Sequence, residues 1–154
     1  MRGVRQSRAI LDLADGFAAN PAESRMRWVA LRYGLPVPLC QYELWVDGQQ
    51  YFTDNLWIVD GPDGPRPVVA EFDGALKYCG AEGAAAVVRE KKREDAIRRR
   101  HRAEFARLTW PTLQRPDAAF REMLEAFPPG TVPVLQPRPE LEPRRPRRGA
   151  RTRS

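Results

Sequence analysis

The stretch Val68-Val69-Ala70-Glu71-Phe72-Asp73-Gly74 decides how this chain folds. Its apolar residues predict a buried central strand, which the turn-forming pair Asp73-Gly74 ends. Glu71 interrupts this apolar run, and a carboxylate is costly to bury unless another group pairs with it. Glu71 is therefore the first candidate for a functional residue, whereas Asp73 alone is typical of an ordinary strand terminator.

Two further strand-like runs come before the central strand. Residues 41–46 and 50–59 flank Asp47-Gly48, a hairpin signal because a type I′ turn needs positive φ at both of its central positions. A second cluster of turn residues at 60–65 leads into the central strand. The three strands are therefore expected to form a meander.

Helical patterns lie on both sides of the strands. Asn20 suits the cap of a first helix, Pro21 its first position, and Gly34 the position that stops it. Later, the pattern predicts a helix, a short strand and a last helix, at residues 84–101, 105–109 and 116–127. The order helix–three strands–helix–strand–helix indicates a mixed sheet covered by helices, in the α/β (α+β) class.

Charge and composition divide the 154 residues into one domain and a tail. Residues 128–154 hold seven of the 15 prolines and a net charge of +5, out of +6 for the whole chain. We expect a helical lead-in at 1–19, one domain at 20–127, and a disordered Pro/Arg-rich tail at 128–154. The basic character therefore belongs mainly to the tail, whose role is either solvated disorder or non-specific attraction to DNA.

Several classes of protein are excluded by composition. The sequence has no run of roughly 18 apolar residues, the length that a membrane-spanning helix needs. The apolar stretch near the start is too short for a secretory signal. Two Cys and one His can build neither a disulfide scaffold nor a structural zinc site. A cytoplasmic protein is expected, with chemistry that depends on carboxylates, Lys and Arg; its oligomeric state stays open.

Acidic residues are predicted to meet at one end of the sheet. Asp54 lies late on the hairpin strand next to Glu71, and Asp73 leaves the same face as Glu71. Two carboxylates suit Mg²⁺, which needs roughly one or two because water and substrate phosphate complete its octahedron. Such an ion makes hydroxide from water and neutralises charge on a phosphate. The alternative is that these acids only form turns.

Other charged residues have two interpretations each. Glu23 either closes a capping box with Asn20 or approaches the acids from the helix end. Lys77, one of three lysines against 23 arginines, either steadies a phosphate and the attacking water or is a solvated loop cation. The long helix carries a basic run that either contacts phosphates or forms a solvated face: Arg89, Lys91, Lys92 and Arg93.

Several motifs within residues 5–127 together match the order and spacing of a known family. They are ESRMR at 23–27, GLPVP at 34–38 with Gln41, TDNLW at 53–57, VAEFDG at 69–74, KY at 77–78, EKKRED at 90–95 and RLTW at 107–110. In these motifs the chain resembles the DUF559 family, which is widespread in actinobacteria. That family is similar to the PD-(D/E)xK restriction-endonuclease-like nucleases and is related to very-short-patch-repair endonucleases.

The resemblance implies a restriction-endonuclease-like core at residues 20–127, acting on DNA with Mg²⁺ or Mn²⁺. It implies that Asp54 and Glu71 hold the metal, with support from Glu23. The usual motif places Lys two residues after the acid, where this chain has Asp73. Either Lys77 or Lys91 would then substitute for it, or Asp73 would itself join the metal shell.

Two functions follow from these observations. The first is a Mg²⁺-dependent DNA endonuclease-like protein that hydrolyses phosphodiester bonds, which the Asp54 and Glu71 pair favours. The second is a catalytically inactive DNA-binding or toxin–antitoxin-type regulatory protein on the same fold, which the displaced lysine favours. For the first function, phosphate contacts predict salt-sensitive DNA binding with little sequence information.

Overall fold

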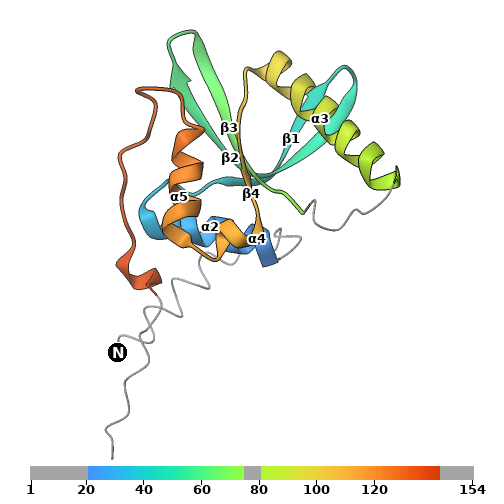
Figure 1. Ribbon diagram of the computed structural model, residues 1–154. Helices are drawn as coiled ribbons and strands as arrows, with labels where there is room; N and C mark the ends of the chain where they lie inside the picture. Colours follow the sequence, from blue (N-terminus) through green and yellow to red (C-terminus); the bar gives the residue numbers. More distant parts are fainter. Residues whose placement is uncertain (1–20, 75–80, 143–154) are drawn as a thin grey trace, which may run out of the picture.

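A four-stranded sheet forms the centre of the computed structural model, which describes residues 21–74 and 84–142 in full and the backbone of 81–83 (Figure 1). The strands are β1 (Leu39–Val46), β2 (Gln49–Gly61), β3 (Gly64–Phe72) and β4 (Glu104–Leu108), in that spatial order. The first three pair antiparallel, and β4 pairs parallel with β3. The predicted mixed sheet and α+β class are confirmed.

Helices cover the two faces of this sheet (Figure 1). The described helices are α2 (Pro21–Tyr33), α3 (Ala81–His101), α4 (Trp110–Leu113), α5 (Pro116–Glu125) and the 3₁₀ turn η2 (Pro139–Leu141). One apolar cluster joins α2, α4 and α5 to one face of the sheet, and a second joins α3 to the other. Within the described ranges, no helix is both long enough and apolar enough to cross a membrane.

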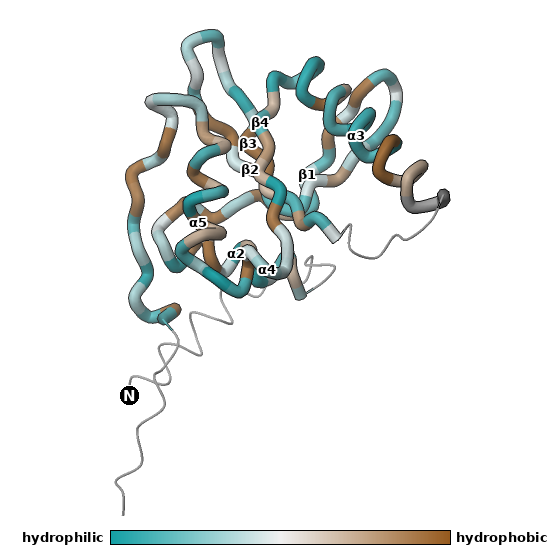
Figure 2. Tube along the Cα trace, viewed as in Figure 1, coloured by the Kyte–Doolittle hydropathy of each residue, from teal (hydrophilic) through white to brown (hydrophobic). Residues whose placement is uncertain are grey.

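Strand β3 is buried on both faces, as expected for a central strand. Val68 and Ala70 pack into the cluster with α2 and α5, whereas Val69 packs into the cluster with α3. In Figure 2 the central strands contain brown, hydrophobic stretches, whereas α3 is mainly teal. Near its end, β3 also buries the charged Glu71 beside these apolar residues.

The hairpin between β1 and β2 turns at the predicted dipeptide. Asp47 and Gly48 have φ values of 50° and 77°, which are the positive values that a type I′ turn requires. The sequence pattern thus located the turn of this hairpin, and the pairing of Val46 with Gln49 closes it.

The segment after α5 corrects the prediction that residues 128–154 are disordered. In Figure 1 this segment runs back beside α5 and ends next to α2. Gln136 N–H donates to Gly34 O at 2.8 Å and Arg138 N–H to Arg32 O at 3.0 Å. Trp28 Nε1 donates to Leu141 O at 3.1 Å, and the Leu141 side chain is buried.

We call residues 134–142 the C-terminal strap. The prediction of disorder is wrong for the strap. It rested on composition, which cannot predict that Leu141 is buried or that the strap backbone bonds to the end of α2. The lead-in at 1–19, the proposed cap Asn20 and the remainder of the tail, 143–154, lie outside the described residues.

Replacing Gly34 by Ala tests the packing of the strap. Gly34 has a φ of +102°, and a Cβ there would lie 2.5 Å from Gln136 N. We expect Gly34→Ala to lower the free energy of unfolding by about 2–4 kcal/mol, from backbone strain and displacement of the strap. Urea denaturation measures it.

Gly48→Ala is the matched control, because Gly48 also has positive φ but its Cβ would meet nothing within 4 Å. It should cost only about 1 kcal/mol, from backbone strain alone. Equal losses in the two variants would show that the strap does not pack on Gly34.

Candidate functional site

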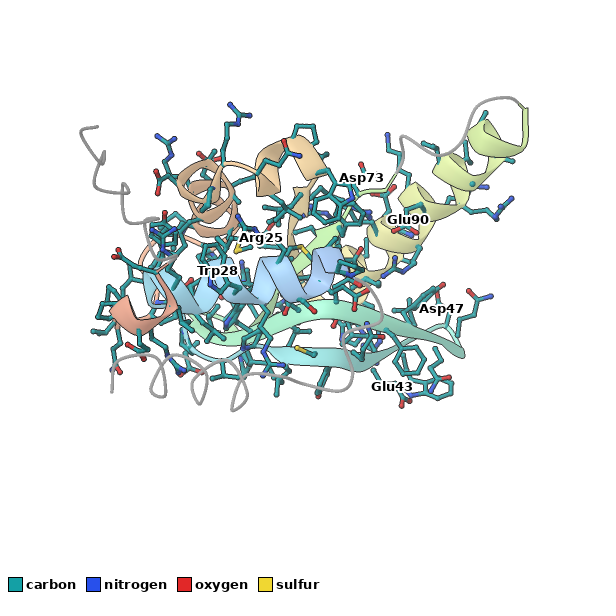
Figure 3. The ribbon with its side chains drawn as sticks, turned by 90° about the horizontal axis from the view of Figure 1, so that it is seen from below. Arg25, Trp28, Glu43, Asp47, Asp73 and Glu90 are labelled. Carbon is teal, nitrogen blue, oxygen red and sulfur yellow. The ribbon has the colours of Figure 1, made fainter. Side chains whose placement is uncertain are left out.

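A cleft of about 850 Å³ opens where the first half of β2 and the end of β3 face the first half of α3. Asp73 beyond β3 and Glu90 on α3, both labelled in Figure 3, line it from the two sides. The charged residues around it come from several elements and loops: Asp54, Glu71, Asp73, Glu90, Lys91, Arg93, Glu94, Asp95 and Arg107. The cleft therefore collects most of the residues that the sequence marked for chemistry.

The strand ladders break at Asp54. Pairing between β2 and β3 stops at Asn55 and Ala70, so the next position places Asp54 across from Glu71. Pairing between β1 and β2 is interrupted at Gln41, which has a φ of 49°. Asp54 Oδ2 accepts a hydrogen bond from Phe72 N–H at 2.8 Å. The Asp54 side chain thus bridges the strands where they begin to separate.

The Asp54 carboxyl group lies in a negative environment. Burial is the main cause that raises its pKa, from the ordinary value of 3.8 to about 6, against the lowering effect of the Phe72 N–H. The charges of Glu23 and Glu71 raise this pKa further, while Arg93 lowers it. Glu23 and Glu71 are therefore close enough for their charges to act on Asp54, and a cation beside Asp54 would relieve this repulsion.

Glu71 is buried and paired with two arginines. Its side chain is 5% exposed, and Arg93 Nη2 lies 2.6 Å from Oε1. Arg93 Nη1 donates to Oε2 at 3.4 Å, and Arg107 Nη2 lies 3.5 Å from the same oxygen. Burial still raises the pKa of Glu71, because it outweighs the lowering effect of the two guanidinium groups. The salt bridges stabilise a charge that the apolar strand alone would not tolerate.

Both arginines also bind acids on α3. Arg93 Nη1 lies 2.6 Å from Glu90 Oε1, and Arg107 Nη2 lies 2.8 Å from the same atom and 2.9 Å from Glu94 Oε2. Since Arg107 pairs with Glu71 in the ladder of β3 and β4, this network connects α3 to both strands. Glu90 was expected to face the cleft if the long helix packed beside the strand ends, whereas Arg107 and Glu94 were not predicted, although both occur in the motifs at 107–110 and 90–95.

The other predicted acids border the pair. Glu23 is 6% exposed in the first turn of α2, and its Oε2 accepts a hydrogen bond from Gln41 Nε2 at 3.3 Å. Asp73 lies just beyond β3 in the cleft, with its backbone N–H bonded to Leu108 O at 2.8 Å. In the described part of the chain, no three His, Cys, Asp or Glu side chains form a metal-binding group.

The predicted basic residues divide between two hollows. Lys91 and Arg93 line the cleft, while Arg89, Lys92 and Arg93 line an adjacent hollow of about 690 Å³ between α3 and the β1–β2 hairpin. Arg89, Lys91 and Lys92 are exposed, so their charges are accessible to an anion. Lys77 lies outside the described residues.

Comparisons with known proteins give two relatives of this chain. The uncharacterized proteins MT2308 and Rv2248, from two strains of Mycobacterium tuberculosis, are each 32% identical to it over 92 residues. The matched region is 60% of this chain and 31% of each relative, so the chain spans less than a third of their length. No family model and no solved structure matches the chain.

Asp54→Asn tests the electrostatics of this site through stability. The pKa of Asp54 is about 6 in the folded protein against 3.8 for an unburied carboxyl, so ionising Asp54 destabilises the folded state as pH rises through that window. In metal-free buffer, we expect the variant to gain on the order of 1–2 kcal/mol over wild type at pH 7. Below a pH of about 4 the gain should vanish.

Urea titrations from pH 4 to pH 8 measure this difference. Asp60→Asn, on an exposed Asp of the same strand, controls for the loss of one acid. A loss of stability in Asp54→Asn at pH 7, or a difference that does not change with pH, would contradict this account of Asp54.

Proposed function

We propose that this chain is a Mg²⁺-dependent DNA endonuclease-like domain that hydrolyses phosphodiester bonds on a restriction-endonuclease-like core. One observation carries the proposal: Asp54 and Glu71 face each other and line one cleft, at the point where β2 and β3 separate. The order of α2, the three-strand meander, α3 and β4 supports the proposed core. The resemblance to DUF559 agrees with this assignment.

The residues at this point fit a hard divalent cation. Asp54 and Glu71 supply carboxylate oxygens, the donors that Mg²⁺ and Mn²⁺ prefer. Burial and neighbouring acids make ionised Asp54 unfavourable without a cation. When bound, such an ion supplies an activated water and neutralises charge on the phosphate. Glu23, held by Gln41, supports Asp54 from the α2 side.

The cations of this chain supply the remaining positive charge. Arg93 lies beside the two acids, in the role that the motif normally gives to Lys. Lys91 at the cleft, with Arg89 and Lys92 at the adjacent hollow, would contact phosphates of the nucleic acid backbone. Such contacts give affinity and orientation without reading sequence.

A second candidate function is a non-catalytic DNA-binding or toxin–antitoxin-type regulator. The observation that favours it is the pairing of Glu71 with Arg93 and Arg107, which competes with metal for the carboxylate. In addition, no lysine among the residues that the structure describes forms an ion pair with Asp54 or Glu71. Cleavage assays separate the two functions.

Cleavage of supercoiled plasmid with Mg²⁺ or Mn²⁺ tests the endonuclease. We expect nicking by wild type, and a decrease of at least about 100-fold in Asp54→Asn and Glu71→Gln, because each loses one metal ligand. Asp60→Asn should cut at the wild-type rate, and EDTA should stop cutting.

The remaining outcomes of this assay are equally informative. Equal cutting by all variants would indicate a contaminant or a different site. Binding of DNA without cutting in either metal would contradict the endonuclease and favour the regulator.

The salt dependence of DNA binding tests the basic surface of α3. We expect Lys91→Ala/Lys92→Ala to lessen the slope of log Kd against log salt by about 0.9 for each phosphate that the variant no longer neutralises. Arg99→Ala/Arg100→Ala removes the same charge from exposed positions near the C-terminal end of α3, whereas Lys91 and Lys92 lie at its middle. Fluorescence anisotropy with a labelled duplex measures the slopes of both double variants. Equal slopes in the two variants would place the phosphate contacts away from Lys91 and Lys92.

A further inference from the structure

The Arg93 guanidinium already lies beside Glu71, where a cation bound by Glu71 would have to lie. It contacts Glu71 Oε1 at 2.6 Å, Glu90 Oε1 at 2.6 Å and Phe52 O at 3.3 Å. Its charge also acts on Asp54, so it lies close to both proposed ligands. A divalent cation shared by Asp54 and Glu71 would therefore meet a positive charge already in place, and the two would repel each other.

Arg93 has a second acidic partner, Glu90, which would still bind the guanidinium if a cation occupied Glu71. Nη1 is held by Glu90, on the same helix, while Nη2 is the group that binds Glu71 Oε1. Both Arg93 and Glu90 line the cleft and the adjacent hollow, next to exposed Lys91 and Lys92. The contact with Glu90 would thus hold the guanidinium beside the cleft if an anion there drew Nη2 away from Glu71.

Arg107 differs from Arg93 in which partner it binds most closely. It lies 2.8 Å from Glu90 and 2.9 Å from Glu94, but 3.5 Å from Glu71. Its position on β4, in register with Glu71, also fixes its backbone. Arg107 therefore has two closer acidic partners than Glu71, whereas Arg93 is the guanidinium in closest contact with Glu71, which a cation at Glu71 would displace.

We propose that Arg93 is an exchangeable positioning residue, which neutralises Glu71 in the ligand-free protein and passes to a backbone phosphate of nucleic acid when a divalent cation binds Asp54 and Glu71. Phosphate is a good acceptor for a guanidinium, because it accepts two parallel N–H bonds and carries full charge. This inference rests on the proposed function of the same site.

Binding of metal and binding of nucleic acid are then coupled. A phosphate draws Arg93 from Glu71 and leaves the carboxylate to the ion, and the ion in turn frees Arg93 for the phosphate. Because the coupling is reciprocal, each ligand increases the affinity for the other by the same factor. The ion alone binds weakly, because it must displace Arg93 without any new partner for the guanidinium.

Titration of Mn²⁺, followed by the electron paramagnetic resonance signal of the free ion, tests this coupling. The wild-type protein is titrated alone and with a short duplex carrying hydrolysis-resistant phosphorothioate linkages. Asp54→Asn with the same duplex gives the background from ions that the DNA holds. We expect the duplex to raise the Mn²⁺ affinity of wild type by at least about 10-fold.

Arg93→Gln should bind Mn²⁺ about 10-fold more tightly than wild type without DNA, and the duplex should change its affinity less than about 2-fold. Arg93→Lys, which keeps the charge, should retain part of the coupling. Arg98→Gln is the matched control, since Arg98 lies on the same helix and pairs with Glu94 and Glu104. It should behave as wild type in both titrations.

The wild-type titrations alone can overturn the inference, even if Arg93→Gln fails to fold by circular dichroism. Equal Mn²⁺ affinity with and without the duplex would overturn the coupling and leave the proposed function standing. No binding above the Asp54→Asn background under either condition would overturn the proposed function together with this inference. A folded Arg93→Gln that couples like wild type would show that another residue is responsible.

Discussion

The buried charge of Glu71 is the constraint on which this structure depends. An unpaired buried carboxylate would cost several kcal/mol, and Glu71, near the end of β3 and next to the buried Val69 and Ala70, has a side chain that is only 5% exposed. Arg93 from α3 and Arg107 from β4 provide the compensating charge. The same ion pairs therefore attach the crossover helix and the parallel strand to the meander. Removing Glu71 would leave two arginines competing for the acids of α3.

Asp54, the second acid, is held in position by a different means. At Asp54, β2 no longer pairs with β3, and the carboxylate bonds to Phe72 N–H where the strands part. Separation of strands is thus what allows a cleft beside the acid, and burial in that cleft is what makes its charge unfavourable. The arrangement combines unfavourable electrostatics with access for a ligand, a combination that is typical of functional sites.

Local patterns in the sequence predicted most of the elements and the two central acids. The apolar run around Glu71, the Asp47-Gly48 turn and the proline and glycine that bound α2 each act within a few residues, so periodicity and turn chemistry suffice to locate them. The contact between Arg93 and Glu71 depends on how α3 crosses the sheet, which no local pattern specifies. The strap depends on the fit of a proline-rich backbone against Gly34, and composition alone indicated disorder there.

The central claim is that Asp54 and Glu71 hold one divalent cation between them. A crystal of the protein grown with Mn²⁺ and a short hydrolysis-resistant duplex, measured for anomalous scattering from manganese, tests this claim most directly. The account predicts an anomalous peak that bridges the two carboxylates, with Arg93 turned away from Glu71. Arg93 still bound to Glu71, with no peak between the two acids or with manganese only at other positions, would contradict it.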